Sequence, residues 1–402
     1  MKKHKRSTFS GKLGFVLSAA GASVGLGNIW RFPYLAAKYG GGIFLLVYII
    51  LALTFGYTLI MAETSLGRMT RKSPVGAFES FGNSRFISIG GWINAIIPIL
   101  IVPYYSVIGG WVIKYLIEYF AGHSKTLAGD AYFTTFISNG WSTEICFIIF
   151  TLFTLGIIYA GVRNGIERVS KFMMPILIVL SLIIAVYSVT RPGAIEGVKY
   201  FLVPNFDHFS WMTVVSAMGQ MFYSLSIAMG ILITFGSYMK KDISIEDSTR
   251  NVEVFDTAIA IMAGLMIIPA VFAFSGGNPD TLQAGPALMF ITIPKVFENM
   301  GLGTAIGILF FLLVLFAALT SSIALTESAV STFEDEIGWS RKKSTVLVGV
   351  IMIVLGSLSS LGYGPLAFVK IIGMQFLDFF DFLTNSVMMP IAALMTSLLV
   401  AR

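Results

Sequence analysis

The sequence is short of the residues that dominate soluble proteins. Only 12% of its 402 residues are charged, against about 25% in an ordinary soluble domain. It contains one cysteine, so no disulfide can form within the chain, and its three histidines are far apart. No HExxH, P-loop or Cys/His metal-binding pattern is present, so these motifs do not indicate an enzyme. These shortages exclude a soluble globular domain, a disordered chain and a nucleic-acid-binding protein.

Long hydrophobic runs are what the sequence has instead. Apolar residues make up 56% of the chain, and the mean hydropathy is +0.83. A helix needs about 20 mostly apolar residues to cross a membrane. Such runs occur at residues 10–37, 41–68, 87–120, 143–161, 169–189, 209–238, 252–275, 303–333, 345–362 and 369–401. We therefore predict an all-α polytopic membrane protein with about ten transmembrane helices in a single transmembrane domain, residues 1–402.

Lysine and arginine are distributed unevenly among the predicted loops. Most of the 27 lie on one side of the membrane if the N-terminus is cytoplasmic, and cytoplasmic loops are the ones that carry excess positive charge. In that orientation the segment 276–302 is an extracellular loop. Membrane topology therefore explains the net charge of +6, and no nucleic-acid partner is needed.

Two predicted spans are interrupted at mid-membrane. The first contains GASVGLGN at 21–28, and the sixth contains GQMFYSLSIAMG at 219–230. Close packing through small residues would explain either segment alone. However, the interruptions occupy corresponding positions in two five-span halves, 1–190 and 207–402, and an odd number of spans makes the second half an inverted copy of the first. Paired broken helices in inverted repeats indicate a secondary transporter, because the freed N–H and C=O groups can bind an anionic group and a cation.

Three segments make the pattern more specific. Residues 21–33, GASVGLGNIWRFP, followed by glycines at 40–42, resemble the first-helix signature of the neurotransmitter:sodium symporter family. Residues 220–226, QMFYSLS, are similar to the family's broken sixth helix, and residues 316–321, FAALTS, to its eighth. The resemblance covers nearly the whole chain and is greatest to bacterial transporters of hydrophobic and aromatic amino acids. It implies a LeuT-type 5+5 inverted repeat with discontinuous helices 1 and 6.

The resemblance also implies a function. It predicts a sodium-coupled symporter, not an enzyme, that imports a hydrophobic or aromatic L-amino acid by alternating access across a bacterial cytoplasmic membrane. The partners are then the amino acid, sodium and the lipid bilayer, while a homodimer is left open. No cofactor is expected, and two Na⁺ ions would be co-transported ligands. Two alternatives stay open: a proton-coupled amino-acid exchanger of the same fold, and a channel or binding-only receptor.

A substrate site and two sodium sites follow from the same resemblance. The substrate site would comprise Ala22, Leu26, Gly27, Ile101, Tyr105, Tyr223, Ser224, Ser226, Met229, Ser321 and Leu325. The first sodium site would use Ser23, Asn28, Ser224, Asp256 and the substrate carboxylate, and the second Gly21, Val24, Ala317, Thr320 and Ser321. All these ion ligands are oxygen donors, which a hard cation prefers. The alternatives are hydrogen bonding of Thr320 and Ser321 to their own helix and ordinary core packing for the apolar residues.

Asp256 and Ala260 depart from the family pattern. Many relatives have Asn at the first position, and the chloride-dependent ones have Ser at the second. Ala260 offers no ligand for an anion, whereas Asp256 supplies a fixed carboxylate. We therefore expect transport to be chloride-independent, with Asp256 ligating Na⁺. The alternative is that Asp256 faces a cytoplasmic loop.

Charged and aromatic residues near the breaks are expected to form two gates. The extracellular gate would comprise Arg31, Tyr223 and Asp381, and the intracellular gate Arg6, Phe9, Tyr238 and Asp335. Ion pairs suit gates because exposed ones contribute only about 0–1 kcal/mol. For Arg6 and Asp335 the alternative is a solvated position at the surface. Glu63, within span two, would hold the unwound part of span six or act as a proton site.

Overall fold

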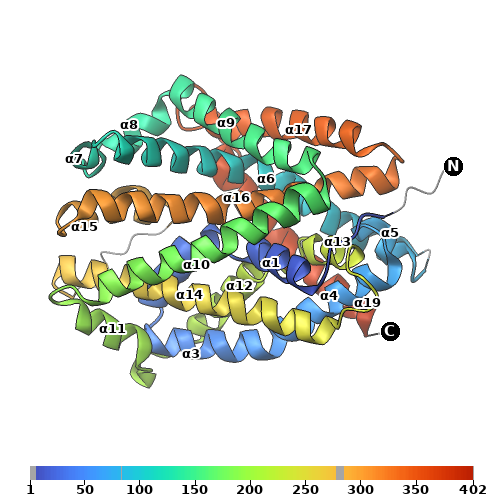
Figure 1. Cartoon of the computed structure of the whole chain (residues 1–402), viewed down its shortest axis with the longest axis horizontal. Coiled ribbons are helices and arrows are strands. Elements are labelled where there is room, and N and C mark those ends of the chain that lie inside the picture. The colour runs from blue at the N-terminus through green and yellow to red at the C-terminus, as the bar shows by residue number, and fades with distance from the viewer. Residues whose placement is uncertain (1–5, 83, 278–284, 402) are drawn as a thin grey trace.

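The computed structural model describes residues 6–82, 84–277 and 285–401. Within them the regular structure is helical, apart from two isolated β-bridges. Eight helices are long and apolar enough to cross a membrane, and a bent pair makes a ninth span. Most of the long helices run roughly along the long axis of the molecule (Figure 1). This architecture agrees with the predicted all-α polytopic class.

The unbroken spans follow the predicted hydrophobic runs closely. They are α3–η2–α4 (Gly42–Leu51, Ala52–Gly56, Tyr57–Thr70), α6 (Arg85–Phe120), α9 (Gly140–Tyr159), η3–α10 (Val162–Glu167, Arg168–Val189), α14 (Ile245–Ser275), α16 (Gly303–Glu336), α17 (Arg341–Leu361) and α18–η7–α19 (Phe376–Asp381, Phe382–Met388, Met389–Val400). Three starts differ from the prediction by seven residues: η3 begins at Val162 instead of 169, α18 at Phe376 instead of 369, and α14 at Ile245 instead of 252. The Ser244 side chain accepts a hydrogen bond from the Asp247 N–H and caps a polar first turn that hydropathy alone does not detect.

The two remaining spans are broken where the sequence predicts. The first consists of α1 (Lys12–Ser23) followed by η1 (Gly27–Arg31) and α2 (Phe32–Lys38), with a bend of 53° between the two halves. The second consists of α12 (Trp211–Ser224) and α13 (Ile231–Ser237), which are each too short to cross a bilayer alone. Between them the backbone has positive φ at Ser226 (54°), Ala228 (62°) and Gly230 (68°), so it cannot continue as a right-handed helix.

Short helices gather at the two ends of the bundle. α7 (Ser124–Leu127), α8 (Tyr132–Ser138), α11 (Ala194–Leu202) and α15 (Ile293–Glu298) lie at one end, while α5 (Pro74–Glu79) lies near the opposite end, together with both chain termini (Figure 1). The predicted extracellular loop 276–302 includes residues 278–284, which lie outside the described residues. Its later part forms η6 (Leu288–Thr292) and α15.

An aromatic cluster fastens this loop to the bundle. Phe290 of η6 is stacked on Phe133 of α8, with ring centroids 5.1 Å apart, and meets Tyr115 of α6 edge-on at 4.9 Å. The Tyr115 hydroxyl donates a hydrogen bond to the Phe290 carbonyl at 2.7 Å. Trp111 and Phe311 complete the cluster, which is buried. The loop is therefore held by aromatic packing in addition to the ion pair between Lys295 of α15 and Asp130.

At the other end, α4 and α13 touch backbone to backbone. A methyl group on Gly67 of α4 would overlap with the Ile233 carbonyl of α13. A methyl on Gly236 of α13 would likewise overlap with the Thr64 carbonyl of α4. The glycines therefore allow a contact without an intervening layer of side chains, as small residues do in membrane helix pairs.

Candidate functional site

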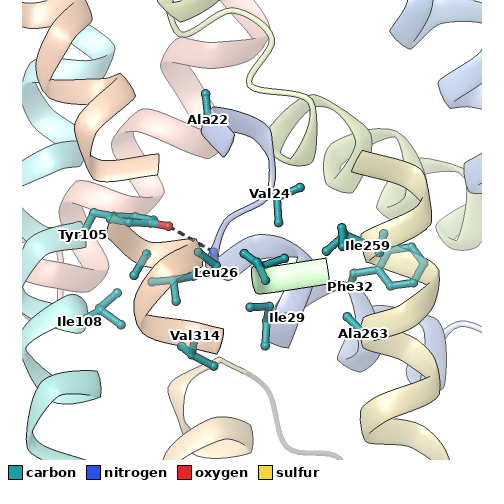
Figure 2. Packing of buried hydrophobic residues seen from close by; sticks show 14 of the residues in the cluster. Ala22, Val24, Leu26, Ile29, Phe32, Tyr105, Ile108, Ile259, Ala263 and Val314 are labelled. Atoms are coloured by element: carbon teal, nitrogen blue, oxygen red, sulfur yellow. Dashed lines mark hydrogen bonds between the residues drawn. The ribbon is translucent and has the colours of Figure 1, made fainter. Parts of the chain in front are cut away.

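The break in the first span lies at the centre of the molecule. α1 ends at Ser23, and Val24 has extended backbone angles (φ −72°, ψ 91°). Figure 2 shows the chain passing from Ala22 by way of Val24 to Leu26, where the Tyr105 hydroxyl points at the backbone. That hydroxyl accepts a hydrogen bond from the Leu26 N–H at 3.1 Å. Backbone groups freed by the break are therefore enclosed by protein and not exposed to lipid.

Hydrogen bonds join this break to the one in the second span. The Ser226 hydroxyl donates to the Ala22 carbonyl at 3.2 Å. The Gln220 side chain donates to the Gly27 carbonyl at 3.0 Å, although sequence reasoning assigned Gln220 no role. The two interruptions, which are about two hundred residues apart in the sequence, thus form one polar centre.

A small cavity opens at this centre, and residues from both broken spans line it. It brings together the expected substrate residues Ala22, Leu26, Gly27, Ile101, Tyr105, Tyr223, Ser226, Met229, Ser321 and Leu325, and it is also lined by Ser23, Gly25, Asn28 and Ile231. Ser224 is the expected substrate residue that does not line it, because its hydroxyl is directed at Asp256. Ile231 was missed because an isoleucine at the start of a helix is indistinguishable from core.

Close approach to an aromatic ring explains why the motif has glycine at position 27. A methyl group on Gly27 would collide with the Tyr223 ring. Tyr223 therefore lies directly over the unwound chain, between the cavity and the outer end of the bundle. Its position agrees with the expectation that it covers the site.

Asp256 is buried beside Asn28 with only neutral partners. Its carboxylate accepts hydrogen bonds from the Asn28 side chain at 2.8 Å, from the Ser224 hydroxyl at 2.9 and 3.0 Å, and from the Tyr48 hydroxyl at 3.1 Å. Among the described residues, no Lys, Arg or His lies within 4 Å of it. It is fully buried, so the alternative of a loop-facing Asp256 is wrong. An anion at membrane depth without a counter-charge is costly, and a bound cation would remove that cost.

Tyr48 belongs to this polar centre, although sequence reasoning did not single it out. Its hydroxyl contacts Asp256, and its ring packs edge-on against Phe32 at 5.0 Å. A tyrosine within an apolar run carries no signal that separates it from core aromatics, so only the structure assigns it to this centre.

The residues expected at the second sodium site also meet. The Ser321 hydroxyl lies 3.0 Å from the Ala22 carbonyl and 3.4 Å from those of Gly21 and Val24. The Thr320 hydroxyl donates to its own helix, at Phe316 and Ala317. This is the alternative considered for Thr320, but donating a hydrogen leaves the lone pairs of the hydroxyl oxygen free for a cation. The arrangement therefore offers hydroxyl and carbonyl oxygens to one small volume.

Glu63 supports the broken part of the second span. Its Oε1 accepts a hydrogen bond from the N–H of Ala228 at 2.8 Å. Ala228 and the nearby Ser226 both have positive φ. The other carboxylate oxygen is buried without a partner. Glu63 thus holds the loop in a conformation that Ser226 and Ala228 would otherwise avoid.

The four residues of the expected intracellular gate are in contact. Arg6 forms a two-pronged ion pair with Asp335 at 2.7 and 2.8 Å, and its guanidinium lies 4.8 Å above the Tyr238 ring. Phe9 is fully buried and donates its N–H to the Tyr238 carbonyl at 3.1 Å. Burial would lower the pKa of Arg6, but Tyr238 and Asp335 raise it above its usual value, so the charge persists. Arg6 is therefore not a solvated surface charge, whereas Asp335 meets it from an exposed position.

Neighbouring groups strengthen this closure, and sequence reasoning missed them. Ser237 and Ser331 accept hydrogen bonds from Arg6 at 2.8 to 3.0 Å. Four residues after Arg6, the Ser10 N–H donates a hydrogen bond to Glu167 at 2.8 Å, and Glu167 pairs with Lys171 at 2.6 Å. The segment before α1 is thus fixed at two places. Common serines and an i,i+4 charge pair give no sequence signal for such a role.

The expected extracellular gate is arranged differently. Arg31 lies 5.1 Å above the Tyr223 ring, while Asp381 accepts hydrogen bonds from Asn385 at 2.6 Å and Tyr104 at 3.2 Å. Among the described residues, Arg31 and Asp381 are not within ion-pair distance of each other. Both line a larger cavity on the outer side of Tyr223.

Comparisons with known proteins agree with this geometry. A family model described as the sodium:neurotransmitter symporter family matches residues 6–150 and 133–402. The Bacillus subtilis protein YhdH, described as an uncharacterized sodium-dependent transporter, is 36% identical over 100% of this chain and 88% of its own length. A Haemophilus influenzae protein with the description uncharacterized sodium-dependent transporter is 32% identical over 97% of this chain and 88% of its own length.

A solved structure extends the likeness to the fold. The crystal structure of MhsT in complex with L-phenylalanine matches with a TM-score of 0.88 and 38% sequence identity. The match covers 98% of this chain and 90% of that chain. It confirms the predicted fold class, while the residue limits of the two repeats stay a prediction.

Proposed function

Because the chain belongs to the sodium:neurotransmitter symporter family, we propose that it imports a hydrophobic or aromatic L-amino acid together with Na⁺ by alternating access. Sodium dependence is a property of the family, and the amino-acid substrate is supported by the phenylalanine in the similar MhsT structure. The observation that carries the proposal is the cavity between two broken helices, lined by Asn28, whose side chain donates a hydrogen bond to the buried and otherwise uncompensated Asp256.

The cavity has the polarity that a zwitterion needs. The Leu26 N–H and the Tyr105 hydroxyl stand on one side and would receive the substrate carboxylate. The Ala22 carbonyl and the Ser226 hydroxyl stand on the other and would receive the ammonium group. The apolar part of the wall, formed by Ile101, Met229, Ile231 and Leu325, would take the side chain. Met is unbranched and adaptable, so the wall suits bulky aliphatic and aromatic side chains.

Two sodium ions would complete the charge balance. One would lie at Asp256 and Asn28, where the substrate carboxylate would add a ligand, so that ion and amino acid bind cooperatively. The other would lie among the Ser321 and Thr320 hydroxyls and the carbonyls of α1. Both donor sets are made of oxygen, which suits Na⁺.

Access would alternate between the two ends of the bundle. The inner end is closed by Arg6, Asp335, Phe9 and Tyr238, while a cavity lies outside Tyr223. In this arrangement Tyr223 separates the substrate cavity from the outer cavity, and the substrate would enter from the outer side. We place the N-terminus in the cytoplasm of a bacterium, since the basic loops then lie inside.

Uptake into proteoliposomes tests this function. Radiolabelled L-phenylalanine and L-leucine should accumulate under an inward Na⁺ gradient and not under matched Li⁺, K⁺ or proton gradients. Tyrosine and tryptophan should compete for uptake, and glycine or a charged amino acid should not. Accumulation driven by protons without Na⁺ would favour the exchanger instead. An amino acid that equilibrates across the membrane but never accumulates against its own gradient would favour a channel.

Substitution of Asp256 links the function to its site. Asp256→Asn should reduce sodium-dependent uptake at least tenfold, because charge-assisted interactions contribute about 1.5–3 kcal/mol. Glu246→Gln, on the exposed start of the same helix, is the control and should retain uptake. Replacement of chloride by gluconate at constant Na⁺ should leave wild-type uptake unchanged; a strong fall would end the claim of chloride independence.

A further inference from the structure

α14 carries more buried oxygen atoms than the Asp256 centre requires. Thr249, Glu253 and Asp256 are spaced at i, i+4 and i+7, so they share one face of the helix. All three are buried: Glu253 is 3% exposed, and Thr249 and Asp256 are fully enclosed. This line of residues runs from the Asp256 centre toward the N-terminal end of α14, the end where Lys12 and Asp247 meet at 3.6 Å.

Glu253 and Thr249 have no partner that explains their burial. The Glu253 Oε1 and the Thr249 hydroxyl are both enclosed and form no hydrogen bond. Among the described residues, no cationic group lies within 4 Å of Glu253, and the nearby Arg250 is exposed. By contrast, Asp256 has three side-chain donors. Burying an unpaired carboxylate costs several kcal/mol, so a structural role does not account for Glu253.

The two groups together make a donor set for a cation. A carboxylate and a hydroxyl oxygen are hard ligands of the kind that Na⁺ accepts. Three residues along a helix correspond to about 4.5 Å of rise, so an ion leaving Asp256 would meet the next carboxylate one turn away. A proton would satisfy Glu253 but would leave the Thr249 oxygen without a ligand.

We propose that Glu253 and Thr249 form a transient sodium site, one helical turn from the Asp256 centre, through which the ion passes toward the N-terminal end of α14. This inference rests on the proposed function. α1 packs against α14 along this route, and Lys12 of α1 pairs with Asp247 at its end. Both side chains of that pair are largely exposed, so the pair contributes little to stability and can open readily.

The test compares Glu253→Gln with Glu246→Gln, an exposed residue on the same helix. Purified protein is reconstituted into proteoliposomes, and release of ²²Na⁺ into the lumen during inward transport of phenylalanine is followed, alongside equilibrium sodium binding and uptake. In Glu253→Gln, sodium release and uptake should slow about tenfold, as expected for loss of one charge-assisted ligand. Equilibrium sodium affinity should stay within about twofold of wild type, because the Asp256 ligands are retained. Glu246→Gln should match wild type in all three.

A second variant separates the sodium site from a general defect. Thr249→Val removes the hydroxyl and preserves shape, and it should slow release in the same direction by about threefold, a neutral-ligand effect. If Glu253→Gln does not purify as a monodisperse protein, Glu253→Asp takes its place: it keeps the charge but withdraws it by one methylene, and release should again slow.

Each outcome decides the proposal. Normal sodium release in Glu253→Gln and Thr249→Val overturns it. A Glu253→Gln variant that loses the pH dependence of uptake but releases sodium normally shows a proton site and also overturns it. If wild-type protein shows no sodium-dependent uptake, the proposed function fails and this site with it. If wild-type uptake depends on sodium and the variants are unchanged, only the site fails.

Discussion

The two ends of the bundle use the same kinds of residue in different arrangements. At the inner end Arg6 touches both Asp335 and the Tyr238 ring. At the outer end an arginine again lies over a tyrosine ring, but the aspartate, Asp381, is bonded to neutral side chains instead. The inner end is therefore fully assembled, whereas the outer end has its parts in place without the central ion pair. In the proposed transport cycle, closure of the outer end would then depend on the contact between Arg31 and Asp381 being made, because both residues are already in place.

Removing the inner aromatic packing should have the largest effect. Phe9 is fully buried and meets Phe15, Phe235 and Tyr238 with ring centroids 5.6 to 6.0 Å apart. Phe9→Ala should weaken inner closure by about 3 kcal/mol, or about two orders of magnitude in the equilibrium. A thiol reagent added from the cytoplasmic side should then label Thr234→Cys much faster than in the otherwise unchanged protein. Equal labelling would show that the ring packing does not close the path.

Removing the inner ion pair should come next. Arg6→Ala deletes the bonds to Asp335, Ser237 and Ser331, and it should weaken closure by about 2 kcal/mol, or about thirtyfold. The same labelling of Thr234→Cys measures it. Lys171→Ala, which leaves this cluster intact, is the control and should have less effect. If the inner end stays closed in Arg6→Ala, the ion pair is not what distinguishes the inner end from the outer end.

Neutralising Asp381 should have a smaller effect, which is expected only when the amino acid is bound. In Asp381→Asn, sodium binding without amino acid should be unchanged, because Asp381 does not contact Arg31 in this arrangement. Phenylalanine should dissociate up to about fivefold faster, since an exposed pair formed on closing contributes about 0–1 kcal/mol. Asp378→Asn, in the wall of the same outer cavity, is the matched control. Equal dissociation rates in the two variants would mean that Asp381 takes no part in outer closure.

The smallest effect is expected from the outer cation–π contact. Arg31→Lys keeps the charge but weakens stacking on Tyr223, for which an exposed contact contributes about 0.5–1 kcal/mol. Phenylalanine affinity should fall twofold to fivefold, measured by scintillation proximity binding. Tyr223→Phe keeps the ring and should resemble wild type. A larger loss in Tyr223→Phe than in Arg31→Lys would assign the role to the hydroxyl instead.

Much of this molecule was predictable from its sequence, for identifiable physical reasons. Long apolar runs and the glycine-rich interruption at 21–28 predict spans and breaks because lipid leaves few alternatives to a continuous helix. The family signature places most of the cavity wall. It does not find Tyr48, Gln220 or Ser237, since a tyrosine, an amide or a serine inside a span has many roles. It also does not reveal that Arg31 and Asp381 stand apart, because a pattern of residues does not specify which conformation they adopt.

The glycine contact between α4 and α13 has a mechanical consequence. Because backbone contacts backbone at Gly67 and Gly236, no layer of side chains separates the two helices, and we expect them to move together. Since α13 leads directly into Tyr238, any hinge that uncovers the cytoplasmic vestibule must either swing α1 aside or carry α4 with it. Tilting of α4 in a thinner or thicker bilayer would thereby be transmitted to the proposed intracellular gate at Tyr238. Bilayer thickness would then influence the proposed transport cycle.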